Sequence, residues 1–82
     1  MMSYQLQPLC YYLANDESEK PWITQFLGFE GDSCMFDDIY QMNNEHFDHN
    51  YKISRDKIDS DFVGDFIVVE QVSQESHPEY WL

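Results

Sequence analysis

The densest group of side chains that could do chemistry lies in residues 36–50, FDDIYQMNNEHFDHN. This stretch holds four carboxylates and two histidines, and it has no lysine or arginine. Carboxylates and imidazoles at this density could bind a metal ion, exchange protons or attract a cationic partner. The first question is therefore which of these three chemistries the rest of the chain favours.

Catalysis finds little support in the sequence. Asp37 and Asp38 could act as an acid and a base, but neighbouring residues on a helix point about 100° apart. The chain has no serine or cysteine nucleophile motif, and its three glycines do not form a phosphate-binding loop. A chain of 82 residues also has little volume for a cleft. We therefore expect no enzyme activity and no cofactor.

One partial match is to a calcium-binding loop. Four residues fall on positions 1, 3, 6 and 12 of the EF-hand pattern, namely Asp59, Asp61, Gly64 and Glu70. Val63 at position 5 offers no side-chain oxygen, and the segment 67–69 favours a strand where an EF-hand needs a helix. Calcium binding is therefore a minor alternative.

A second partial match is to a zinc site. His46, His49, Cys10 and Cys34 are suitable ligand types, but the chain lacks a closely spaced cysteine pair. We expect His46 to be a half-buried core residue. Both cysteines are expected to be reduced and mostly buried, with a single disulfide as the alternative. Zinc binding is the other minor alternative, and we assign no metal site.

The net charge limits the function most strongly. Sixteen Asp and Glu face four Lys and Arg, so the formal net charge is −12. This charge disfavours direct binding to nucleic acid or to an anionic membrane, and it favours basic surfaces such as nucleic-acid-binding clefts. The alternative is that the charge serves only solubility. Because no signal peptide or membrane-spanning run is recognisable, we expect a cytoplasmic protein.

The elements that must position these charges are predicted to form one acidic α+β domain over residues 1–82. Strands are expected at three segments, Leu9–Leu13, Tyr51–Ile53 and Asp65–Val72. The last strand is expected to be buried on both faces. A helix is favoured over a strand for 18–28, and 54–60 forms a helical turn or a loop. The prediction is a short antiparallel sheet with one or two helices between N- and C-terminal strands.

The clearest predicted helix runs from Cys34 to about Asp48. On a helical wheel its apolar residues fall on one side and its polar residues on the other. The polar side carries Asp37, Asp38, Gln41, Asn44, Glu45 and Asp48. Its four acids would form an exposed ridge about 16 Å long, which could stand in for a piece of DNA backbone.

A second acidic cluster and an aromatic C-terminus complete the predicted partner-binding surface. The cluster consists of Asp56, Asp59, Asp61 and Asp65. Tyr80 and Trp81 follow the last predicted strand, so they could fold back over the sheet or anchor a partner. An exposed edge strand would also permit a homodimer.

In size, charge and lack of catalytic motifs, the chain resembles the small acidic inhibitors that phages and mobile elements carry against host defence. These include anti-restriction, anti-BREX and anti-CRISPR proteins. The resemblance is one of composition and implies no particular functional residue. It predicts an inhibitor that blocks a nucleic-acid-binding protein, by mimicking DNA or by covering its basic surface. The other hypothesis is a non-catalytic structural or regulatory interaction module.

Overall fold

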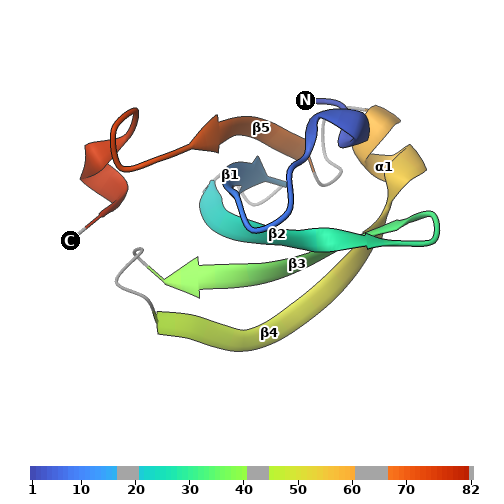
Figure 1. Ribbon diagram of the computed structural model, residues 1–82, viewed down its shortest axis with the longest axis horizontal. Coiled ribbons are helices and arrows are strands. Elements are labelled where there is room, and N and C mark those ends of the chain that lie inside the picture. The colour runs from blue at the N-terminus through green and yellow to red at the C-terminus, as the bar shows by residue number, and fades with distance from the viewer. Residues whose placement is uncertain (17–20, 41–44, 61–66, 82) are drawn as a thin grey trace.

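Five antiparallel strands form most of the protein in the computed structural model, which describes residues 1–16, 21–40, 45–60 and 67–81 (Figure 1). The strands are β1 (Tyr11–Asn15), β2 (Trp22–Glu30), β3 (Ser33–Tyr40), β4 (Glu45–Ser54) and β5 (Ile67–Val72). One short α-helix, α1 (Arg55–Ser60), follows β4. Two 3-10 turns, η1 (Ser3–Gln5) and η2 (Pro78–Tyr80), lie near the chain ends.

The strand order in the sheet is β4-β3-β2-β1-β5. Strands β1 to β4 run as a meander, and β5 then pairs antiparallel with the other side of β1. The sheet is strongly curved, with β5 on one side and β3 and β4 on the other (Figure 1). This connectivity leaves β4 and β5 as the two edge strands.

The predicted α+β class is wrong, because both long predicted helices are strands. The segment 18–28 contains most of β2, and Cys34–Asp48 covers nearly all of β3 and the start of β4. Burial in β3 alternates, with Cys34 and Phe36 fully buried and Met35 between them only half-buried. Over so few residues, period-2 alternation also places several apolar groups on one side of a helical wheel.

The β2–β3 hairpin has a signal in the sequence. Glu30 pairs with Ser33, so the loop consists of Gly31 and Asp32 alone. Gly31 has a φ of 59°, a left-handed conformation that tight hairpin loops require and that glycine adopts readily. The Gly-Asp pair marks a hairpin turn, whereas the sequence prediction treats it as a break before a helix.

The remaining element predictions are closer to the structure. The predicted strand Leu9–Leu13 overlaps β1, and Tyr51–Ile53 lies within β4. The predicted turn at 54–60 is α1. Strand 65–72 is observed from Ile67, but its expected burial on both faces is wrong because Val69 is 45% exposed. Val68 and Val72 are nonetheless buried, so the exposure is confined to part of the strand.

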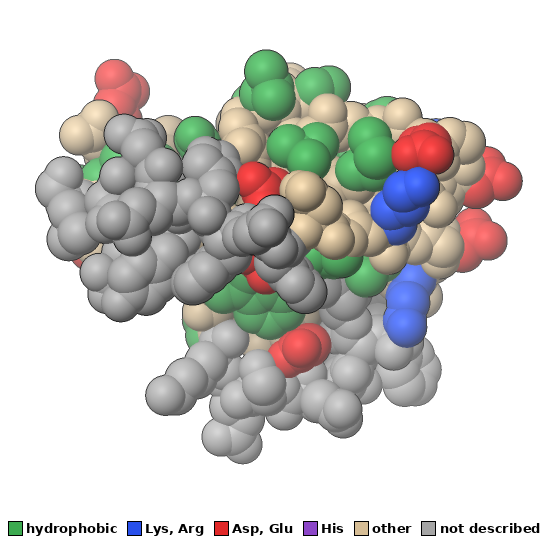
Figure 2. Space-filling model, turned by 90° about the horizontal axis from the view of Figure 1, so that it is seen from below, with side chains coloured by type: hydrophobic (Ala, Val, Ile, Leu, Met, Phe, Trp, Pro, Cys, Tyr) green, Lys and Arg blue, Asp and Glu red, His purple; other side chains and the backbone are tan. Residues whose placement is uncertain are grey.

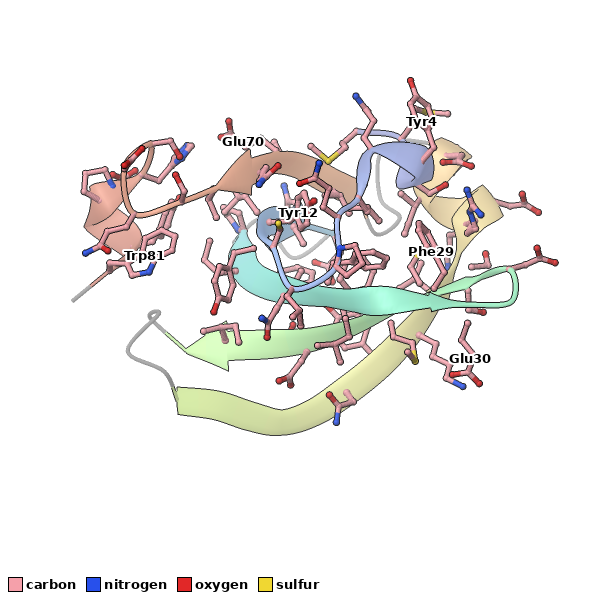
Figure 3. The ribbon with its side chains drawn as sticks, viewed as in Figure 1. Tyr4, Tyr12, Phe29, Glu30, Glu70 and Trp81 are labelled. Atoms are coloured by element: carbon pink, nitrogen blue, oxygen red, sulfur yellow. The ribbon has the colours of Figure 1, made fainter. Side chains whose placement is uncertain are left out.

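The main core lies inside the curve of the sheet. It consists of Leu6, Tyr12, Ala14, Phe26, Cys34, Phe36, Ile58 and Val68. Leu6 follows η1 and Ile58 belongs to α1, so these two turns close the inner side, where Figure 3 shows Tyr12. Burying one such large side chain stabilises the fold by about 1.5–3 kcal/mol.

A second, smaller apolar cluster lies on the outer side of the sheet. Its buried members are Ile23, Ile39 and Val72, and they alternate with the inward-facing residues. Tyr80 and Trp81 pack against this cluster, and the Trp81 ring meets the Tyr11 ring edge-on at 6.1 Å. The aromatic C-terminus therefore folds back over the sheet, which is one of the two arrangements considered from the sequence.

Candidate functional site

Asp38 is held firmly within the fold. Its Oδ1 atom accepts hydrogen bonds from Trp22 Nε1 at 2.9 Å and from the Tyr51 hydroxyl at 3.0 Å. The Tyr51 hydroxyl and Thr24 Oγ1 share a further hydrogen bond of 3.0 Å. Trp22 and Thr24 belong to β2, Asp38 to β3 and Tyr51 to β4, so the carboxylate joins three strands. Its observed contacts are structural.

The Tyr51 side chain, which donates to Asp38, also packs against another aromatic ring. Its ring stacks on Phe36, with centroids 5.7 Å apart and planes at 22°. Burial raises the pKa of the Tyr51 hydroxyl, because the charged phenolate would lose its solvation. The hydroxyl therefore keeps its proton at neutral pH and can donate a hydrogen bond to Asp38.

Asp59 also forms a structural contact. Its Oδ1 atom accepts a hydrogen bond of 2.7 Å from the Ser3 backbone N–H, which joins α1 to η1. Hydrogen bonds from Ser3 hold the pKa of this carboxyl below its usual range, and the charge of Arg55 acts in the same direction. Arg55 itself donates to Ser3 Oγ at 3.3 Å and covers the Phe29 ring at 4.6 Å.

The predicted acidic ridge is not formed as a helix face. Asp37 and Asp38 are neighbours on β3, so their side chains point to opposite sides of the sheet. Glu45 and Asp48 belong to β4, but their side chains lie outside the described part of the structure. Asp37 is half-buried and opposes Gln25 and Asn50 on the adjacent strands.

The predicted second cluster is only partly described. Asp56 is exposed on α1, four residues from the end of the helix, whereas Asp59 contacts Ser3. Asp61 and Asp65 lie outside the described residues. The partner-binding role of all these acids stays a prediction.

Among the residues whose side chains are described, the exposed acids fall into two groups that differ in their neighbours. At the end formed by the β2–β3 turn and α1, the exposed acids are Glu30, Asp32 and Asp56. The same end holds Lys52, Arg55 and Lys57, and Lys52 pairs with Glu30 at 3.0 Å. Figure 2 shows Lys and Arg side chains beside acids at one end of the visible face. Positive charge at this end partly offsets the acids.

The C-terminal segment, residues 67–81, carries exposed acids and no Lys or Arg of its own. Glu70, Glu75 and Glu79 are exposed there. Figure 3 shows Glu70 and Glu30 in well-separated parts of the molecule. His77 Nε2 lies 3.3 Å from Glu70 Oε1, a contact that is an ion pair only when His77 is protonated. The sequence analysis leaves these acids out of its partner-binding surface, because they are scattered along the chain.

His77 also raises the question of catalysis, because Ser76 Oγ lies 2.7 Å from its Nδ1 atom. Ser76, His77 and Glu70 thus form a serine–histidine–carboxylate row. Ser76 Oγ also bonds the Ser73 backbone N–H and hydroxyl, so it is engaged in an exposed turn. The row fastens this turn to β5, and its geometry gives no support for acyl transfer.

A shallow hollow of about 330 Å³ lies between β2, β3 and β4, on the outer side of the sheet. The described residues that line it are Leu27, Met35, Asn50, Tyr51 and Lys52. Figure 2 shows hydrophobic side chains grouped on part of the visible face, beside the end with Lys and Arg. The helical wheel concealed this site, because it placed Met35 and Phe36 in one helix.

The metal alternatives gain no support from the described residues. Within these ranges, no three His, Cys, Asp or Glu side chains come together as metal ligands. Of the calcium pattern, Asp59 lies in α1 and Glu70 in β5, while Asp61 and Gly64 fall outside the description. Of the zinc set, Cys10 and Cys34 are free thiols, and burial raises the pKa of Cys34. The side chains of residues 46 and 49 are not described.

The fold and surface together define a small, mostly β domain with a curved five-stranded sheet and an acidic exterior. No family model, curated protein or solved structure matches the chain. In the part of the chain that the structure describes, no helix has the length and apolar character to cross a membrane.

Proposed function

We propose that this protein is a small acidic inhibitor that binds the basic surface of a nucleic-acid-binding protein. Its action in a host cytoplasm, as an anti-defence factor of a phage or mobile element, is part of the same proposal. The observation that carries it is a net charge of −12 on a compact domain. Exposed acids occur at both ends of that domain, in the β2–β3 turn and α1 and in the C-terminal segment.

This charge gives the protein a way to find its partner. The summed field of many surface carboxylates attracts a cationic surface over a distance and raises the association rate. The same field repels nucleic acid itself. The proposed partner is therefore the cationic surface of a protein that binds nucleic acid. Salt screens the attraction beyond about 10 Å at 0.1 M, so association should weaken as salt rises.

Of the two mechanisms considered, covering the basic surface is favoured over copying the DNA backbone. A helical ridge with evenly spaced acids would support copying, but Asp37 and Asp38 lie on a strand and point apart. Covering a surface needs only opposite charge and sufficient contact area. It makes no demand on the spacing of individual carboxylates.

The proposal can be tested by capture and competition. The immobilised protein would be exposed to heparin-binding proteins from a bacterial lysate, at low and high salt and with or without duplex DNA. Captured proteins would be identified by mass spectrometry. We expect nucleic-acid-binding proteins to be retained at low salt, released at high salt and displaced by duplex DNA.

A direct assay then tests inhibition. The fluorescence anisotropy of labelled duplex DNA reports its binding to the captured protein, and added inhibitor should release the DNA stoichiometrically. A matched control neutralises four exposed acids, Asp32→Asn, Asp56→Asn, Glu75→Gln and Glu79→Gln, which changes the net charge from −12 to −8. A captured protein that keeps its DNA in the presence of excess inhibitor would contradict the proposal and favour a structural interaction module.

A further inference from the structure

A second hollow, of about 370 Å³, lies between the start of β1, the end of β5 and the segment that follows β5. We call it the C-terminal hollow. Its described lining combines apolar side chains with two amide side chains, and it includes Leu9, Tyr11, Val72, Trp81, Gln71 and Gln74. A hollow of this kind suits a side chain that has an apolar stem and a polar head.

Leu9 is held in place at this hollow. It is 66% exposed, and its φ of 68° is a left-handed conformation that leucine seldom adopts. Its N–H donates to the Phe26 carbonyl at 2.6 Å, and Gln25 Nε2 donates to the Leu9 carbonyl at 3.1 Å. Backbone strain of this kind persists only where the surrounding contacts impose it. Strand β2 therefore fixes an exposed apolar side chain beside the hollow without burying it in the core.

Tyr11 and Trp81 supply two aromatic walls. Both are half-buried, and their ring planes stand at 83° to each other with centroids 6.1 Å apart. A guanidinium group is planar and weakly hydrated, so it stacks on aromatic rings better than a lysine ammonium does. The amide oxygens of Gln71 and Gln74 can accept hydrogen bonds from its N–H groups. The lining therefore fits an arginine side chain, with its stem against Leu9.

The charge around the C-terminal hollow favours such a cation. Segments 1–16 and 67–81 supply all of its described lining, and neither segment contains Lys or Arg. Glu75 directly follows Gln74 and is exposed, and Glu79 is exposed in the same segment. The attraction is therefore local to this part of the chain, in addition to the attraction exerted by the whole protein.

Positive charge on the described residues lies elsewhere or is offset. The described Lys and Arg side chains belong to β4 and α1, at the end of the molecule that contains Glu30. Figure 3 shows Glu30 and Trp81 toward opposite ends. His77 has its Nε2 atom 3.3 Å from Glu70 Oε1, so that carboxylate offsets any charge on the imidazole. An arginine in the hollow therefore meets no described Lys or Arg.

We propose that the C-terminal hollow binds an arginine side chain of the partner protein. This inference rests on the proposed function and names one contact by which it would work. Proteins that bind nucleic acid use arginine side chains to contact phosphates. An arginine held in the hollow is withdrawn from the nucleic acid. The exposed acids attract the partner, and this contact slows its release.

Three capped tripeptides, each with glycine on both sides of a central residue, test the chemistry. The central residue is arginine, lysine, or citrulline, which has the shape of arginine without its charge. In NMR of the whole protein, we expect the arginine peptide to shift the Trp81 indole and Leu9 methyl signals. The citrulline peptide should bind more weakly by on the order of tenfold, and the lysine peptide several-fold more weakly.

A charge-matched pair of variants locates the site. Gln74→Arg places a cation in the hollow, whereas Gln5→Arg places the same cation on η1, where Gln5 is also exposed. Both variants change the net charge from −12 to −11. We expect Gln74→Arg to weaken binding of the arginine peptide by on the order of tenfold, and Gln5→Arg to change it much less. Circular dichroism of both variants checks that each is folded.

Three results would overturn the arginine site. They are equal binding of the arginine and lysine peptides, equal effects of the two variants, and peptide-induced shifts confined to residues outside the hollow. Sedimentation showing self-association that Gln74→Arg abolishes would also overturn it, by assigning the hollow to a second copy.

The arginine site and the proposed inhibition can fail separately, because the peptide experiments do not depend on capture. A failed capture with selective binding of the arginine peptide would reject the proposed inhibition and support the site. A captured partner that releases its DNA, together with no preference for the arginine peptide, would reject the site and support the inhibition.

Discussion

The two sides of the sheet differ in how completely they are covered. On the inner side, Tyr12, Phe26 and Phe36 are fully buried beneath η1 and α1. On the outer side, the C-terminal segment covers one part, and the described side chains leave the hollow at Leu27 and Met35 open. The inner side therefore holds the fold together, and the outer side has surface available for a partner.

The acids divide in a similar way. Asp38 and Asp59 are fixed by hydrogen bonds between elements, whereas Glu75 and Glu79 are exposed. Residue type does not separate the two groups, because both consist of ordinary Asp and Glu residues. The comparison teaches that all of these carboxylates can add to the long-range field, whereas only the exposed ones are placed for direct contact with a partner. It also gives predictions of different size for the two kinds of acid.

The largest expected effect comes from adjacent residues on opposite sides of β3. Phe36→Ala removes a fully buried ring from the inner core and should lower the free energy of unfolding by about 3–5 kcal/mol. Met35→Ala acts on the half-buried outer side and should cost at most about 1 kcal/mol. Urea unfolding followed by circular dichroism measures both. Equal losses would show that the two sides are equally packed.

A smaller effect is expected in the hydrogen-bonded group around Asp38. Tyr51→Phe removes a donor to Asp38 and a hydrogen-bond partner of Thr24, which should cost about 1–3 kcal/mol. Tyr4→Phe is the control, because Tyr4 is 71% exposed. A loss no larger than the control would mean that the carboxylate does not depend on Tyr51.

The same variant has a pH signature. The pKa of Tyr51 is raised in the folded protein, so its contribution is complete below the ordinary tyrosine pKa of about 10 and is lost as pH rises further. The stability difference between the wild type and Tyr51→Phe should therefore shrink at strongly alkaline pH. Unfolding midpoints measured between neutral and alkaline pH test this.

The smallest effect concerns the contact between α1 and η1. The pKa of Asp59 is lowered in the folded protein, so its contribution is present above about pH 4 and is lost as pH falls through the folded value. Asp59→Asn removes the charge, and its difference from the wild type should be greatest at neutral pH and vanish in acid. Asp56→Asn, on the exposed part of the same helix, is the matched control for loss of one carboxylate from α1. A pH-independent difference for Asp59→Asn would contradict the assigned contact.

Part of this fold could be predicted from the sequence. The strand patterns near 9–13, 51–53 and 65–72 and the turn at 54–60 are all found, with shifted ends. The sequence analysis assigns segments 18–28 and 34–48 to helices. In a short window, the same apolar residues can fit both the helical period of 3.6 residues and the strand period of 2. Pairing with distant strands decides between helix and strand in such segments. A local reading of one sequence does not reveal that pairing.

The candidate site was less predictable than the fold. Asp59 contacts Ser3, which is 56 positions away in the chain, so no local pattern could show that its role is structural. The hollow likewise depends on the register that places Leu27, Met35 and Asn50 together across three strands. Net charge, in contrast, is a property of composition, and it was available from the start.

The most direct test of the central claim is the association rate with a captured partner as a function of salt. Stopped-flow measurements would compare the wild type with the variant in which Asp32, Asp56, Glu75 and Glu79 are neutralised. We predict a rate that falls steeply with salt, a slower rate for the variant at low salt, and convergence of the two at high salt, with dissociation little changed. Equal, salt-independent rates would contradict the claim and leave the charge with a role in solubility alone.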